Sequence, residues 1–322
     1  MKKISCIVPC YCSEQTIGNV IARTEYIIRA DGRYDYEIIC VNDGSSDATY
    51  EVLQKLASKT KKIKVVNLAR NFGQHAAVLA GLHYITGDIV LCLDDDGETP
   101  PEQLFTLINT LESSKFDVVS ARYESDDRDV IRKIGTKISM FMSHTMINMP
   151  NNVELNSYFC MKRFVADNMI LYPNPYPFIA GLIFRTTRNV GNVFIERKER
   201  LAGKSNYNFS RLLGLWLNGF TAFSEKPLRA ASIIGVIFAS IGLLETAILI
   251  MQRLIGGITV SGYTSIMSAI LISSGLIMLF LGLLGEYIGR MYICLNKSPQ
   301  YVVRELLNIK EDSHAENISS KR

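Results

Sequence analysis

The sequence predicts an α/β fold, in which a domain built on a mainly parallel sheet is followed by a two-helix transmembrane hairpin. Apolar, β-rich runs alternate with helical patterns over about the first 120 residues, which is typical of a parallel sheet covered by helices. Two 22-residue apolar runs follow, at 230–251 and 264–285, and each is long enough to cross about 30 Å of hydrocarbon as a helix.

The elements of the first domain can be placed in order along the chain. Strands are expected at residues 4–8, 36–41, 63–68, 88–93 and 116–120, where aliphatic and β-branched residues run together. Helices are expected between them, at residues 16–29, 47–58, 74–84 and 101–111. In open α/β sheets ligands bind at the carboxyl ends of the strands, so the residues that follow each strand are the informative ones.

Composition excludes several classes of protein. At 322 residues, with 48% hydrophobic and 20% charged residues, the chain can bury one large core or two modest ones and is not intrinsically disordered. The net charge of +4 is too small to indicate nucleic-acid binding. Its seven cysteines lack the paired spacing of a zinc site and fit a reduced, cytosolic setting.

Basic residues set the expected orientation of the hairpin. The loop between the two runs carries only Arg253, whereas the flanks carry Lys226, Arg229, Arg290, Lys297 and Arg304. The positive-inside rule then places both termini and the first domain in the cytoplasm. The expected boundaries are 1–208 for that domain, 209–229 for an interfacial segment, 230–285 for the hairpin and 286–322 for a cytoplasmic tail.

Two features near the spans have open interpretations. Residues 209–223 are amphipathic and include Trp216, so they fit either an interfacial helix or an ordinary domain helix. Glu245 lies inside the first span, where an ionisable residue is either functional or paired with the second helix, Arg253 or a lipid headgroup.

Three polar loops follow the predicted strands and should meet at one edge of the sheet. They contain Pro9 to Glu14, Asn42 to Asp47, and Asp94 to Glu98. Each of the last two loops also has a purely structural interpretation. The second fits a turn with a helix N-cap, and the third fits an ordinary acidic turn. Two carboxylates spaced as Asp94 and Asp96 can nevertheless direct oxygens at one Mg²⁺ or Mn²⁺, which can bridge a substrate's diphosphate. Neither a dinucleotide-binding glycine motif nor a P-loop occurs, which disfavours a dehydrogenase or a kinase-like NTPase.

A basic segment precedes the interfacial residues. Six cationic side chains accompany only Glu196 and Glu199; they are Arg185, Arg188, Arg197, Lys198, Arg200 and Lys204. A solvated charged face is one interpretation. The other is a loop that brings Arg197 and Arg200 to an anionic diphosphate, with Gly203 and Ser205 permitting close backbone approach.

Taken together, these motifs resemble a known family. The runs VPCYCSEQTI, VNDGSSDAT, LARNFGQHAAVLAGL, LDDDGETPPE and RKERLAGKSNY, with a hairpin ending LGEYIGRMY, resemble the family 2, GT-A-fold polyprenyl-phosphate glycosyltransferases. These include bactoprenol glucosyltransferases and dolichol-phosphate mannose synthases. The resemblance covers about residues 3–303 and implies a GT-A catalytic domain.

The resemblance also implies a role for individual residues. Those expected around the nucleotide are Pro9, Tyr11, Glu14, Asp43, Arg70 and Asp95. Asp94 and Asp96 would hold the divalent metal, with Glu98 next to the sugar. Arg197 and Arg200 would bind the donor's phosphates. The acceptor phosphate would be bound by Arg132, Lys137, Ser139 and Ser205.

Two positions depart from the family pattern. Glu98 stands where the family commonly has Gln, which adds a negative charge near the donor sugar. Ser157 stands where the family often has the carboxylate of a proposed base. Glu154 lies nearby and is either a substitute for that base or an ordinary surface residue. A lipid phosphate monoester, with a second pKa of about 6, is mostly ionised at neutral pH and needs little help from a base.

The expected function is inverting transfer of a hexosyl group, most simply glucose from UDP-glucose, to undecaprenyl phosphate at the cytoplasmic face of a bacterial inner membrane. The alternatives are a related synthase that uses GDP-mannose or a modified sugar nucleotide, and a catalytically silent membrane scaffold. The expected partners are the nucleotide sugar, the polyprenyl phosphate and the membrane. A homo-oligomer, a flippase and a downstream transferase remain open.

Overall fold

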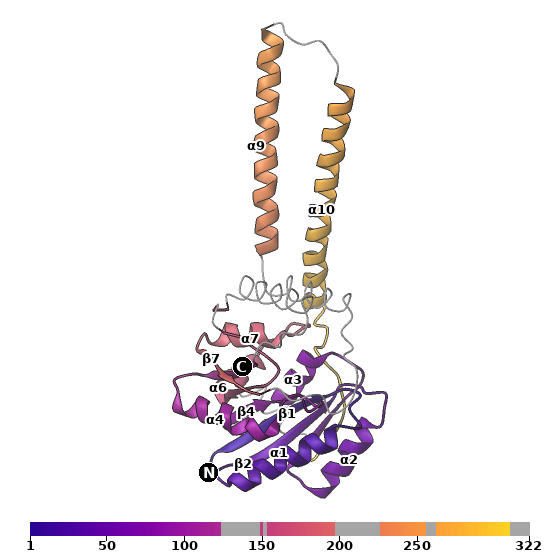
Figure 1. Cartoon of the computed structure of the whole chain (residues 1–322). Helices are drawn as coiled ribbons and strands as arrows, with labels where there is room; N and C mark the ends of the chain where they lie inside the picture. The colour runs from indigo at the N-terminus through magenta and orange to yellow at the C-terminus, as the bar shows by residue number, and fades with distance from the viewer. Residues whose placement is uncertain (124–148, 151–152, 197–225, 256–261, 310–322) are drawn as a thin grey trace. The chain divides into compact units, whose positions relative to one another are not determined.

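The computed structural model describes residues 1–123, 149–150, 153–196, 226–255 and 262–309. The chain forms two compact units (Figure 1). The first combines Met1–Leu212 with Lys297–Arg322, and the second is Leu213–Asn296.

The first unit is built on an eight-stranded sheet, as the sequence predicts in kind. Its strands are β1 (Lys3–Cys10), β2 (Asp35–Asn42), β3 (Ile63–Leu68), β4 (Ile89–Cys92), β5 (Val118–Arg122), β6 (Phe159–Lys162), β7 (Val190–Phe194) and β8 (Val303–Leu307). The order across the sheet is β7-β5-β6-β4-β1-β2-β3-β8. Only β6 and β8 run antiparallel to their neighbours. The mainly parallel sheet is therefore confirmed, whereas β6, β7 and β8 had no counterpart in the sequence prediction.

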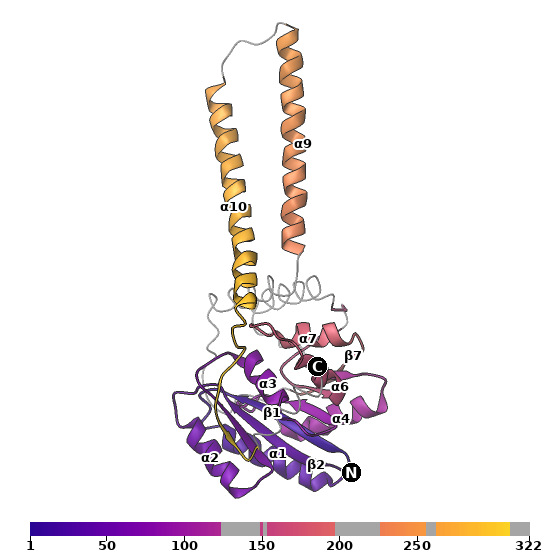
Figure 2. The same ribbon diagram turned by 180° about the vertical axis from the view of Figure 1, so that it is seen from behind.

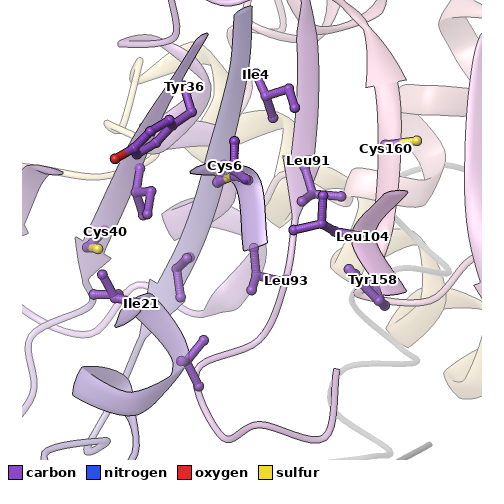
Figure 3. Close-up of a cluster of buried hydrophobic side chains, with 14 of the residues drawn as sticks. Ile4, Cys6, Ile21, Tyr36, Cys40, Leu91, Leu93, Leu104, Tyr158 and Cys160 are labelled. Carbon is purple, nitrogen blue, oxygen red and sulfur yellow. The ribbon is translucent and has the colours of Figure 1, made fainter. Parts of the chain in front are cut away.

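Helices cover both faces of this sheet. They are α1 (Ile17–Asp31), α2 (Thr49–Lys59), α3 (Gln74–Leu82), α4 (Leu104–Ser113), α6 (Arg163–Met169) and α7 (Ile179–Thr186), and a short 3-10 turn, Pro101–Gln103, leads into α4. The apolar sides of α1, α2 and α4 pack against one face of the sheet in a single cluster. Figure 3 shows part of this cluster, with Ile21 of α1 and Leu104 of α4 beside residues of the strands. α3 packs on β1 and β2 and contacts α6 and α7, which lie with it on the other face. All four predicted helices are present, with ends that shift by a few residues.

The carboxyl-terminal strand returns the chain to the first unit. β8 pairs with β3, and the N–H of Ala69 donates to the carbonyl of Val302 at 2.8 Å. Figure 2 shows the segment that follows α10, in gold, running along the sheet domain. Just before it, the Tyr301 hydroxyl lies 2.9 Å from His83 Nδ1. The Gln300 amide donates to the carbonyls of Tyr172 and Asn174. Residues 297–309 thus form a strap along the sheet domain.

The described part of the second unit consists of two long helices, α9 (Lys226–Leu254) and α10 (Tyr263–Leu295). They contain the predicted spans 230–251 and 264–285, so the helical conformation of both is confirmed. Among the described residues, one stretch, Ile272–Leu295, is long and apolar enough to cross a membrane by length and composition. Within the described residues of α9 the apolar stretch, Ala231–Gly242, is shorter than the one in α10.

Candidate active site

The carboxyl ends of β1, β2, β3 and β4 bring four loops together at one edge of the sheet. Backbone-to-side-chain hydrogen bonds join these loops directly. The N–H of Tyr11 donates to Asp95 at 3.0 Å, and the N–H of Cys12 donates to the hydroxyl of Ser45, also at 3.0 Å. Glu14 accepts from the N–H of Ala48 at 2.9 Å. The predicted convergence of the acidic loops is therefore what the fold produces, because parallel strands end at a common edge.

Asp43 ties the loop after β2 to the loop after β3. Its carboxylate is 3% exposed and accepts the N–H groups of Phe72 and Gly73 at 2.7 and 2.9 Å. Burial raises the pKa of Asp43, and these two bonds offset part of the rise. Asp43 thereby fixes the loop that carries Arg70, whose guanidinium stacks on the ring of Phe72 at 4.6 Å.

Gly44 makes this close approach of the two loops possible. Its φ of +64° is a left-handed conformation that favours glycine. A Cβ at this position would lie 2.3 Å from the carbonyl carbon of Arg70 and 2.5 Å from the nitrogen of Asn71.

Of the other predicted nucleotide-binding residues, Pro9 is buried within β1 and Tyr11 is 51% exposed at the edge.

The loop after β4 holds the Asp94 to Glu98 cluster. Asp94 accepts hydrogen bonds from the Gln74 amide at 2.9 Å and from the Ser157 hydroxyl. Burial raises the pKa of Asp94 to about 7, and the charges of Asp96, Asp95 and Glu98 add to the rise, while Ser157 opposes it. A carboxylate whose charge is disfavoured by burial and by other carboxylates is stabilised by a nearby cation.

Further contacts hold the shape of this acidic loop. Asp96 accepts the N–H of Glu98 at 3.0 Å, and Thr99 accepts the N–H of Asp94, also at 3.0 Å. The fully buried Tyr158 donates its hydroxyl to the carbonyl of Pro100 at 3.0 Å. The loop is therefore anchored at both ends.

Ser157 lies at the acidic loop because of the direction of β6. Phe159 at the start of β6 is paired with Cys92 at the end of β4, so the residues just before β6 lie beside those just after β4. Ser157 thus serves as a hydrogen-bond donor to Asp94. Glu154, the proposed substitute, has its carboxylate 3.3 Å from the guanidinium of Arg122.

Gln74 and Ser157 are site residues that the sequence analysis did not assign to the acidic cluster. Gln74 begins α3 directly after the β3 loop, so the rule that ligands bind at strand ends could have found it. No local signal could place Ser157 beside Asp94. Several predicted residues lie outside the described parts of the chain: Arg132, Lys137, Ser139, Arg197, Arg200 and Ser205.

The described residues contain no group of three or more His, Cys, Asp or Glu side chains arranged around one metal position. Mg²⁺ in phosphate-transfer sites is commonly held by one or two carboxylates together with substrate phosphates and water. Asp94 and Asp96, two positions apart in the loop after β4, fit that smaller ligand set.

Comparison with known proteins identifies the family. A model described as glycosyl transferase family 2 matches residues 5–168, and one described as the GtrB C-terminal hairpin matches residues 226–291. The chain belongs to glycosyl transferase family 2. This confirms the resemblance drawn from the motifs, and it makes the protein a glycosyltransferase with a GT-A fold and a carboxyl-terminal hairpin.

Relatives of this family-2 glycosyltransferase match it along almost their whole length. A prophage bactoprenol glucosyl transferase homolog of Escherichia coli is 33% identical over 94% of this chain and 99% of its own. An undecaprenyl-phosphate 4-deoxy-4-formamido-L-arabinose transferase of Photorhabdus laumondii is 31% identical over 95% of each.

A solved structure agrees in fold. Glucosyl-3-phosphoglycerate synthase from Mycobacterium tuberculosis, in complex with Mn²⁺ and UDP-glucose, has a TM-score of 0.51 and 19% identity, and the match covers 67% of this chain and 76% of that one.

Proposed function

We propose that this family-2 glycosyltransferase transfers a hexosyl group, glucose from UDP-glucose, to a polyprenyl phosphate such as undecaprenyl phosphate. The observation that carries the proposal is the acidic loop at the carboxyl edge, in which Ser157 and Gln74 orient Asp94 two residues before Asp96. Relatives named for bactoprenol and undecaprenyl phosphate support the acceptor class.

Asp94 and Asp96 would hold Mg²⁺ or Mn²⁺ against the donor's diphosphate. When bound, the cation stabilises the negative charge that develops on the departing nucleoside diphosphate. The protein's own contribution is orientation: the bonds to Asp94 fix one carboxylate, and the Asp43 bonds fix the Arg70 loop beside the donor. An ionised phosphate monoester is already a nucleophile, so alignment with the anomeric carbon matters more than a base.

The acceptor's nature requires a site at a membrane surface, and the chain's topology is consistent with one. β7 and β8 belong to one sheet, so the bilayer cannot lie between them, and the segment between them crosses it an even number of times. If α10 crosses through Ile272–Leu295, a second crossing is required between β7 and β8, and we assign it to α9. The basic residues that flank both helices favour the cytoplasmic side for the sheet domain and both termini of a bacterial inner-membrane protein.

Glu98 favours a second donor class. Its carboxylate adds to the negative charge of the acidic loop, as its effect on the pKa of Asp94 shows. A sugar with an amino or amide substituent offers N–H donors to such a group. A modified sugar nucleotide is therefore the alternative donor, and the relative from Photorhabdus laumondii is named for a sugar of this kind.

The test is lipid-linked product formation. Purified protein, undecaprenyl phosphate and Mg²⁺ or Mn²⁺ are incubated with labelled UDP-glucose, GDP-mannose or an aminoarabinose nucleotide, and label is counted in the organic extract. We expect label from one donor, lost in Asp96→Asn and kept in Asp35→Asn, a matched change in a surface ion pair with Lys62. Donor binding without label from any sugar would instead support a catalytically silent scaffold.

Further partners follow from the product's chemistry. A sugar phosphate on a polyprenyl lipid has its polar head on the side where it is made, so its use on the other side requires a flippase and a downstream transferase. A homo-oligomer is a further proposed state of the enzyme.

A further inference from the structure

The loop between α6 and α7 exposes large apolar side chains. Residues 171–178 read LYPNPYPF, and we refer to them as the aromatic loop. Leu171 is 55% exposed and Tyr176 50% exposed. Pro175 and Pro177, on either side of Tyr176, are buried. The prolines thus pack inward and direct the aromatic ring between them outward.

The backbone at Tyr176 is in an uncommon conformation. Its φ is +62°, in the left-handed region that a bulky side chain rarely adopts. Residues held in this conformation concentrate where the conformation serves a function. In the aromatic loop the consequence of this conformation is that a large amphipathic side chain faces out.

Contacts to neighbouring elements make the aromatic loop a fixed surface. The Gln300 amide of the strap donates to the carbonyls of Tyr172 and Asn174, the latter at 2.8 Å. The ring of Phe178 meets that of His75 edge-on, with centroids 5.2 Å apart. Burial lowers the pKa of His75 to about 4, so this contact is between an aromatic ring and a neutral imidazole at physiological pH.

Positive charge lies beside the exposed apolar groups. The guanidinium of Arg185, at the end of α7, stacks over the ring of Tyr172 at 5.6 Å. Arg185 and Arg188 are both exposed. Tyrosine and leucine side chains with arginine nearby are favoured at the boundary between an anionic headgroup layer and the acyl chains.

Chain connectivity limits how far the aromatic loop can lie from the membrane. Gln300 follows Leu295, the last residue of α10, by five positions. Five extended residues span at most about 17 Å. The apolar stretch of α10 has 24 residues and is about 36 Å long, slightly more than the hydrocarbon thickness, so its end at Leu295 reaches headgroup level if it crosses.

We infer that the aromatic loop is a lipid-binding surface, in which Leu171 and Tyr176 enter the interfacial layer of the bilayer and Arg185, which stacks on Tyr172, contacts anionic headgroups. The inference rests on the proposed membrane crossing of α10. It adds a second attachment point for the sheet domain. Through Phe178 the loop also packs on the first turn of α3, whose Gln74 holds Asp94.

The test uses single-tryptophan variants of the full chain in liposomes. Trp216 is the only tryptophan in the sequence, and Trp216→Phe provides the background. Into it we place Tyr176→Trp or Leu171→Trp as probes of the aromatic loop. Leu281→Trp, at a 57% exposed position of α10, is the membrane-embedded reference, and Tyr26→Trp, at a 74% exposed position of α1 on the opposite face of the sheet, is the matched aqueous control.

Fluorescence is compared in liposomes of phosphatidylcholine and phosphatidylglycerol with and without bromine near the glycerol end of the acyl chains. We expect emission from both loop probes to fall at least twofold with brominated lipid, and emission from the Tyr26→Trp probe to stay unchanged. The inference is overturned if Leu281→Trp is quenched but the loop probes, like the Tyr26→Trp probe, are not. The crossing of α10 would still stand in that case.

Two further outcomes are distinguishable from that one. If brominated lipid also fails to quench the Leu281→Trp probe, α10 does not cross the bilayer, and the inference is refuted together with that crossing. Loop emission that shifts to the blue with rising protein-to-lipid ratio, but is not quenched by bromine, would identify a second copy of the chain as the partner and overturn the lipid assignment. Thermal unfolding of each variant checks that it is folded, whatever the outcome of the transfer assay.

Discussion

Replacing Gly44 by alanine should separate the two loops that form the donor side of the site. The new Cβ would lie 2.3 Å from the Arg70 carbonyl carbon and 2.7 Å from its Cα, whereas ordinary contact begins at 3.4 Å. Both groups are backbone, so no side-chain rotation relieves the clash. The loop from Arg70 to Gly73 must therefore move by about 1 Å, away from its two hydrogen bonds to Asp43.

The expected effect has two parts. Alanine in the left-handed region costs about 1–2 kcal/mol of folding free energy. A misplacement of about 1 Å near the substrate lowers kcat/KM by about 100-fold, equivalent to about 2.7 kcal/mol of transition-state stabilisation. We expect the loss to appear with respect to the nucleotide sugar, because the displaced loop carries Arg70.

Gly32 provides the matched control. Its φ is +69°, close to that of Gly44, but a Cβ there would meet nothing within 4 Å. Gly32→Ala should therefore lose about 1–2 kcal/mol of stability and keep its kinetics. Initial rates of labelled transfer against donor concentration, with thermal unfolding of both variants, make the comparison. Equal kcat/KM for the two alanine variants would refute the argument that Gly44 sets the position of the Arg70 loop.

Three other changes test separate parts of the structure. Ser157→Ala should weaken metal-dependent transfer by about 10- to 100-fold because Asp94 loses an orienting donor, and Ser157→Thr should retain most activity; a metal titration of the rate checks both. Removing divalent metal with EDTA should stop transfer and adding Mg²⁺ or Mn²⁺ should restore it, so undiminished transfer in EDTA would contradict the roles given to Asp94 and Asp96. Burial raises the pKa of Glu37, but hydrogen bonds from Lys64 and Ser5 outweigh the effect of burial. The pKa therefore falls from 4.5 to about 2. A carboxyl group with a depressed pKa contributes its full stabilisation to the folded state above about pH 4.5. About 3 kcal/mol of this free energy of unfolding is lost as the pH falls towards 2. Urea unfolding at pH 6 and pH 3 should show a smaller pH-dependent loss in Glu37→Gln than in the parent.

Much of the sheet domain could be predicted from local pattern. The strands that carry the site are continuous apolar runs, which is what burial on both faces of a parallel sheet requires. The turn residues after them, among them Asp43 and Asp94, had to lie at one edge once the strands were parallel. The same locality explains the confirmed helical hairpin, since a long apolar run specifies a helix without reference to the rest of the chain.

The strands after residue 123 escaped prediction for a physical reason. β6 has four residues and runs antiparallel between β4 and β5, and β8 has five residues and joins the sheet from beyond the hairpin. Shortness alone does not explain the failure, because β4 and β5 have four and five residues and both were expected. β6 and β8 differ in that they interrupt the parallel alternation of strand and helix, and their direction and neighbours depend on hydrogen bonds to strands far away in sequence.

By itself, then, the sequence determined the family, the α/β class and which loops bear the acidic residues, because those properties follow from local periodicity and from motifs in order. Only the tertiary structure decided what each carboxylate contacts. The oxygens of Asp43 accept backbone N–H groups from residues about 30 positions away, and Ser157 reaches Asp94 across 63 positions. Such contacts arise from the packing of whole strands and loops, and short-range sequence patterns carry no record of them.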